Sequence, residues 1–170
     1  MKLALLTSAA LALSAAPALA SDLTVEIEVP RLQSVEYHAP YVSVWLERAD
    51  QTAVGTLSVW YDVELRNNEG LTWLADMRTW WRKTGRTLTL PADGVSGATR
   101  APGRHSVTFR ADNATLRNLP AGEYTIAVEA ARELGGREIV RVPIRWGGGA
   151  ANASAQGSTE LGAINVTITR

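Results

Sequence analysis

Hydrophobic and polar residues alternate over short stretches along most of the chain. Residues 23–29 alternate strictly, which puts Thr24, Glu26 and Glu28 on one face and apolar side chains on the other. A period of two is typical of a half-buried β-strand. Similar stretches span residues 41–47, 56–61, 86–90, 104–110, 124–130, 139–144 and 164–169. This rhythm of short strands and turns predicts a mainly β protein, an immunoglobulin-like antiparallel β-sandwich.

One segment follows a helical period instead. Its apolar residues recur at intervals of three and four, at Leu71, Leu74, Met77 and Trp81. Gly85 then stands at the position of a C-terminal cap. We predict one amphipathic helix over residues 71–84, inserted between strands. Because large rings bury much area, Trp73, Trp80 and Trp81 are expected mainly in the core, with Trp80 or Trp81 left to face a ligand.

Residues 147–158 are rich in glycine, alanine and serine and contain no large apolar residue. This composition predicts a flexible loop that joins two strands of a final hairpin. A loop of that length is unusual in a compact domain, so a poorly ordered insertion is the other interpretation.

The first 20 residues have the three parts of a secretory signal peptide. Lys2 supplies the positive charge, residues 3–16 form an uncharged apolar run, and small residues precede Ala20. The run is too short for a membrane anchor, and no later segment is apolar enough to span a bilayer. We predict cleavage after Ala20, export to the periplasm, and one domain over residues 21–170.

The amino-acid composition excludes several classes of chemical site and of binding partner. The chain has no cysteine, which excludes disulfides, iron–sulfur clusters and thiolate chemistry. Basic and acidic residues are equal at 17 each, so nothing suggests a nucleic-acid surface. With only His38 and His105, a metal site of several histidines is not available.

A short glycine-containing loop carries the strongest functional signal, the sequence Asp93-Gly94-Val95-Ser96-Gly97-Ala98-Thr99. It resembles the flavin-attachment motif of exported redox proteins, such as the FMN-binding domains of membrane-bound ion-pumping NADH:quinone oxidoreductases. The resemblance implies that a flavin transferase joins FMN to the hydroxyl of Thr99 through a phosphoester. In those proteins further Thr or Ser residues follow the motif, whereas Arg100 follows it here.

The other motif residues have roles that suit such an attachment. Gly97 and Ala98 leave room around the hydroxyl, while Asp93 and Ser96 seat the loop in the transferase or organise its turn. For the cofactor pocket the candidates are Trp80 and Trp81 as flavin contacts and Arg82 and Arg100 as phosphate partners.

Two wider resemblances add context. Residues 39–47, 73–81 and 96–99 resemble a family of bacterial periplasmic proteins known as a domain of unknown function, whose members look associated with exported redox systems that include a flavin transferase and a membrane reductase. Residues 102–130 look like the immunoglobulin-like domain of flagellar hook-capping proteins. In that domain a Pro-x-Gly-x-Tyr turn, here ending at Tyr124, directs the tyrosine inward.

The loop also has alternative interpretations. It is compatible with an ordinary glycine-rich turn. It nearly matches the nucleophile elbow of serine hydrolases, but that motif needs a strand–turn–helix context and an α/β sheet.

We therefore expect a periplasmic carrier of covalent FMN that relays electrons to or from partners and is not itself an enzyme. The alternative is a cofactor-free immunoglobulin-like binding or assembly module, with the tryptophan-rich helix as its contact surface.

Overall fold

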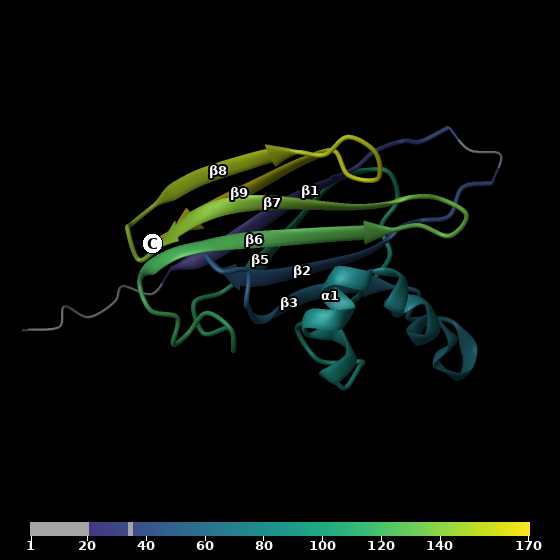
Figure 1. Cartoon of the computed structure of the whole chain (residues 1–170), viewed down its shortest axis with the longest axis horizontal. Coiled ribbons are helices and arrows are strands. Elements are labelled where there is room, and N and C mark those ends of the chain that lie inside the picture. Colours follow the sequence, from purple (N-terminus) through teal and green to yellow (C-terminus); the bar gives the residue numbers. More distant parts are fainter. Residues whose placement is uncertain (1–20, 34–35) are drawn as a thin grey trace, which may run out of the picture.

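Nine strands form two sheets in residues 21–33 and 36–170, the part of the chain that the computed structural model describes (Figure 1). The predicted signal peptide and its cleavage after Ala20 lie outside these residues. The two sheets face each other, which confirms the predicted β-sandwich.

The first sheet is antiparallel, with the strand order β5-β1-β9-β8. Its strands are β1 (Asp22–Val29), β5 (Gly103–Phe109), β8 (Ala151–Gln156) and β9 (Ala163–Thr169). The alternation read from the sequence of β1 matches its burial, because every second side chain is almost fully buried.

The second sheet has the order β4-β3-β2-β6-β7. Its strands are β2 (Tyr41–Arg48), β3 (Ala53–Tyr61), β4 (Ser96–Ala98), β6 (Gly122–Ala131) and β7 (Arg137–Trp146). All neighbours are antiparallel except β4, which runs parallel to β3. Strand β4 was not predicted, because three residues are too few to show a period.

The main core lies between the two sheets and includes Ile27, Val42 and Ile126, each with no exposed surface. A second, smaller core lies on the outer face of the second sheet. Trp45, Val59 and other outward-facing residues of β2, β3 and β6 are buried there under a layer of helical turns. Figure 1 shows this layer covering one face of the sandwich.

The helical layer differs from the single helix predicted over residues 71–84. It consists of a 3-10 helix η1 (Arg66–Asp76), a short helix α1 (Arg78–Lys83) and a 3-10 turn η2 (Gly85–Thr87). Met77 interrupts the helical geometry with a ψ of 70° between η1 and α1. The apolar spacing is nevertheless meaningful, because Leu74 and Met77 face the sheet and are buried. At the next position Trp80 is fully buried, whereas Trp81 is only partly buried.

Gly85 follows α1 for a reason other than capping. Its backbone passes so close to the Trp80 indole that a Cβ would lie 2.7–2.8 Å from ring carbons. Any larger residue would push this ring away from the sheet. Gly85 is therefore needed for packing against Trp80, and not as the helix cap that the sequence predicted.

Two further predictions about strands are wrong. Residues 86–90 form no strand, and the segment is the end of η2 followed by extended chain. Residues 147–158, expected as a flexible loop, contain strand β8, paired with β9 from Ala151 to Gln156. Small residues have little intrinsic strand preference, but the inward-facing Ala153 and Ala155 pack on the main core, and this tertiary contact determines the conformation.

The turn before β6 directs Tyr124 inward. Tyr124 packs into the main core, and its hydroxyl donates a hydrogen bond to the carbonyl oxygen of Pro120 at 3.0 Å. This bond ties the tyrosine to the turn that precedes its own strand.

Candidate functional site

The loop with the flavin-attachment sequence is a tight turn that leads into β4. Gly94 has a φ of 71°, a conformation that favours glycine. The backbone N–H of Ala92 donates to Oγ of Ser96 at 3.0 Å, so the Ser96 hydroxyl closes the turn. Asp93 is exposed at its tip. Of the two roles expected for Ser96, this bond corresponds to the organisation of the turn.

Strand β4 carries the motif along the edge of the second sheet. Its residues pair in parallel with β3, with Ala98 opposite Tyr61, and the N–H of Thr99 donates to the carbonyl oxygen of Tyr61 at 3.2 Å. The Thr99 hydroxyl forms no hydrogen bond with any other residue that the structure describes. Thr99 is thus held by its backbone, and its side chain is not used by the fold.

Thr99 lines a pocket of about 270 Å³ at the end of the sheet. Strands β2 and β6, the chain before β2, the segment after β3 and η1 supply the remaining walls. The pocket is slightly smaller than typical ligand sites, which have volumes of about 300–1,000 Å³. Three aromatic side chains belong to its lining: Tyr37, Tyr41 and Trp73.

Trp73 is the largest of these rings, and 49% of its surface is exposed. It was expected in the core because of its helical spacing. In η1 the buried residue is Leu74, and Trp73, one position earlier, points away from the sheet. The spacing of Leu71, Leu74 and Met77 in the sequence, which leaves Trp73 off the apolar face, was the available signal for its exposure.

The pocket has an acidic character. The carboxyl groups of Asp62, Asp76 and Glu133 belong to its lining. Its one arginine, Arg132, is already paired with Glu160, with 2.9 Å between Nε and Oε2. Burial raises the pKa of Tyr41 above its usual value, so this phenol stays protonated and can donate a hydrogen bond.

The four residues predicted as pocket candidates lie elsewhere. Trp80 has no exposed surface, and its Nε1 donates to Oγ1 of Thr56 at 3.0 Å, so it is a core residue. Trp81 packs against Trp80 with 6.1 Å between ring centroids. Arg82 is exposed and donates to the carbonyl oxygen of Arg78. Arg100 lies over the indole of Trp60, 5.4 Å from the ring centroid, on the other side of the sheet from the pocket.

The structure does not require a glycine at position 97. A Cβ there would lie 3.5 Å from Cδ1 of Trp60, an ordinary van der Waals contact, and the backbone is not left-handed. Ala98 beside it is exposed. The small residues next to Thr99 therefore keep its surroundings open without being needed for packing.

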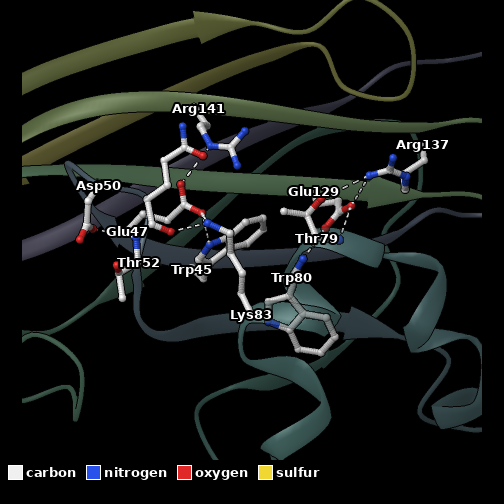
Figure 2. A network of polar contacts seen from close by, with 11 residues as sticks. Trp45, Glu47, Asp50, Thr52, Thr79, Trp80, Lys83, Glu129, Arg137 and Arg141 are labelled. Carbon is white, nitrogen blue, oxygen red and sulfur yellow. Dashed lines mark hydrogen bonds and ion pairs between the residues drawn. The ribbon is translucent and has the colours of Figure 1, made fainter.

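Two buried carboxylates anchor the helical layer that carries Trp73 (Figure 2). Glu129 of β6 accepts hydrogen bonds from the backbone N–H groups of Thr79 and Trp80, at 3.1 and 2.7 Å, and pairs with Arg137 at 2.7 Å. A carboxylate at this end of a helix satisfies N–H groups that have no partner within the helix.

Glu47 of β2 holds the opposite end of α1. It accepts hydrogen bonds from Lys83 at 2.7 Å and Arg141 at 3.0 Å, and from the Trp45 indole at 2.9 Å. Burial raises the pKa of Glu47, but the bonds from Arg141, Lys83 and Trp45 outweigh burial and leave it below its usual value. The two carboxylates thus fix α1 at both ends.

The sequence comparison supplies the family. Residues 22–163 match a family described as predicted periplasmic protein (DUF2271). The chain belongs to this family. No curated protein and no solved structure matches it significantly.

Other features of this DUF2271 protein do not define an activity. No helix in the described residues is long and apolar enough to cross a membrane. Ser96 lies in a strand that follows a turn, without the helix that a nucleophile elbow requires, and Nε2 of His105 contacts the carbonyl oxygen of Ala101 at 2.7 Å.

Proposed function

We propose that this protein carries FMN, bound covalently to Thr99, and relays electrons between partners in the periplasm. The observation that carries the proposal is that the last hydroxyl of the flavin-attachment sequence opens on an aromatic-lined pocket. A plain connecting turn would have no need of such a pocket, and the fold makes no use of the Thr99 side chain.

The attachment is a transfer of a phosphoryl group without oxidation or reduction. The Thr99 Oγ attacks the phosphorus of the FMN half of FAD, and a new O–P bond forms as the anhydride P–O bond to AMP breaks. AMP leaves with the anhydride oxygen, and the hydroxyl proton passes to a base of the flavin transferase. The product is FMN joined to Thr99 through a phosphoester.

The residues around Thr99 suit a tethered flavin. Trp73 and Tyr37 offer partly exposed rings on which a planar ring system stacks, and Tyr41 offers a hydroxyl donor. When bound, FMN supplies the electron-accepting and electron-donating chemistry. A covalent bond prevents its loss from a compartment where it is not replaced.

The test is to produce the full chain in cells with and without a flavin transferase, and then to measure intact mass and in-gel fluorescence after denaturation. We expect a mass increase of one FMN less one water only when the transferase is present. Thr99→Ala abolishes it, whereas Thr99→Ser retains it because serine also has a hydroxyl.

Thr89→Ala is the matched control, since Thr89 is an exposed threonine in the loop before the motif. It is expected to be modified like the unaltered chain. An unmodified Thr99, in cells where the same transferase modifies another motif-bearing protein, contradicts the proposal and favours the cofactor-free binding module.

A further inference from the structure

Exposed apolar side chains gather around the Thr99 pocket. In the described residues, five large hydrophobic side chains are exposed: Tyr37, Val63, Leu65, Trp73 and Leu134. Three of them line the pocket, and the other two are adjacent in sequence to its lining residues Asp62 and Glu133. We refer to these five residues as the apolar rim. Exposed apolar side chains that gather in one place are typical of an interaction surface.

Leu134 is the most unusual member of the rim. It lies in the turn between β6 and β7, with 83% of its surface exposed and a φ of 52°. Leucine in the left-handed region costs roughly 1–2 kcal/mol, and glycine or asparagine is the usual residue there. The fold gains almost no burial from Leu134 in return. Strain of this kind at an exposed apolar residue indicates a role in binding.

Charged side chains lie in the pocket beside the apolar rim. Asp62, Asp76 and Glu133 place three carboxyl groups in the pocket, and the charge of Arg132 is already balanced by Glu160. His38 also belongs to the lining, with Nδ1 3.5 Å from an oxygen of Glu133. The pocket thus has more acidic than basic side chains, with apolar side chains at its edge. It fits a partner that presents lysine or arginine beside an apolar patch.

We propose that the apolar rim is the docking surface for the flavin transferase, an inference that rests on the proposed function. Transfer to Oγ of Thr99 requires the active site of another protein to come within bonding distance of this atom. The surface around Thr99 is then covered by that protein. Lysine or arginine side chains on the surface of that enzyme, beside its active site, complement the acidic side chains of the pocket.

The experiment measures initial rates of flavin attachment with purified full-length chain, purified transferase and saturating FAD. Leu134→Asn removes the apolar side chain and keeps a residue that tolerates positive φ, so the fold is retained. We expect KM for the chain to rise about tenfold with kcat nearly unchanged, because the lost contact contributes to docking and not to chemistry. Adding salt is expected to raise KM for the unaltered chain.

Gln51→Asn is the matched control. Gln51 also has positive φ, 63°, and lies in the turn between β2 and β3. This turn is at the end of the two strands that is far from the Thr99 pocket. KM of the transferase for the Gln51→Asn chain should equal KM for the unaltered chain. If the unaltered chain is modified and Leu134→Asn leaves KM unchanged, or lowers only kcat, the docking surface is refuted. If the unaltered chain is not modified, the proposed function fails instead.

Discussion

At the scale of single residues, several carboxylates of this protein accept many hydrogen bonds from the surrounding chain. Glu138 of β7 is an example. Its two oxygens accept hydrogen bonds from the N–H groups of Ser158, Thr159 and Leu161, and from the hydroxyls of Ser158 and Thr159. Burial raises the pKa of Glu138, but the bonds from these residues outweigh it and lower the pKa to about 2. One side chain thereby orders the turn between β8 and β9.

This shift has a consequence for stability as a function of pH. Because the folded pKa is lowered from 4.5 to about 2, the stabilisation by Glu138 is complete above pH 4.5 and is lost as the pH falls through about 2. We expect Glu138→Gln to cost on the order of 1 kcal/mol at pH 7, after allowance for solvent screening.

The measurement is urea unfolding of both chains at a series of pH values. The difference between them should shrink between pH 4.5 and pH 2, because the amide resembles the protonated carboxyl group. A difference that stays constant over this range would mean that the Glu138 carboxylate does not contribute through its charge.

At the scale of elements, the helical layer is stabilised by tertiary contacts and not by its own helices. Helix α1 has six residues, far fewer than an isolated helix needs in water. Asn67 and Asn68 both have positive φ within η1, and Met77 separates η1 from α1. The layer holds its position because Glu129 and Glu47 fix the two ends of α1 and because Leu74, Met77 and Trp80 are buried on the sheet.

We therefore expect Glu129→Ala to destabilise the protein by roughly 2–4 kcal/mol, since it leaves two helix N–H groups and Arg137 without their acceptor. Glu123→Ala on the same strand is the control. Glu123 is exposed, and its oxygen lies 3.8 Å from Nε of Arg145, so the change should cost less than about 0.5 kcal/mol. Denaturant unfolding of both variants tests the comparison, and equal losses would contradict the anchoring role of Glu129.

At the scale of the whole molecule, two cores share the second sheet. The main core lies between the sheets, and the smaller core lies between the second sheet and the helical layer. The Thr99 pocket is built at the end of the second sheet with one wall from η1. The site therefore depends on the smaller core, while the fold depends on the larger one.

Hydrogen exchange distinguishes the two cores. Leu74→Ala removes a buried side chain of the smaller core and should cost about 2–4 kcal/mol. We expect it to accelerate exchange in α1 while amides of β1 and β9 keep their protection, because the layer opens locally. Ile126→Ala in the main core is expected to accelerate exchange in both sheets and in α1. If Leu74→Ala accelerates hydrogen exchange in β1 as much as in α1, the two cores open as one unit.

The sequence alone determined most of the β architecture. Strict alternation in residues 23–29, and the strand stretches that correspond to β2, β3, β5, β6, β7 and β9, were readable because a sheet with a buried face imposes a period of two. The motif that ends at Thr99 was also readable, because it is continuous in the chain. The apolar spacing identified Leu74 and Met77 as core residues even though the single helix was wrong.

Only the tertiary structure decided the rest. Ala153 and Ala155 form a strand because β9 and the main core are beside them, and no local property of small residues requires this. The exposure of Trp73 depends on how η1 lies on the sheet, with Leu74 turned toward it. Thr99, Trp73 and Tyr41 are distant in sequence, so their common pocket depends on strand pairing across the sheet, which brings the ends of β2, β3 and β4 together.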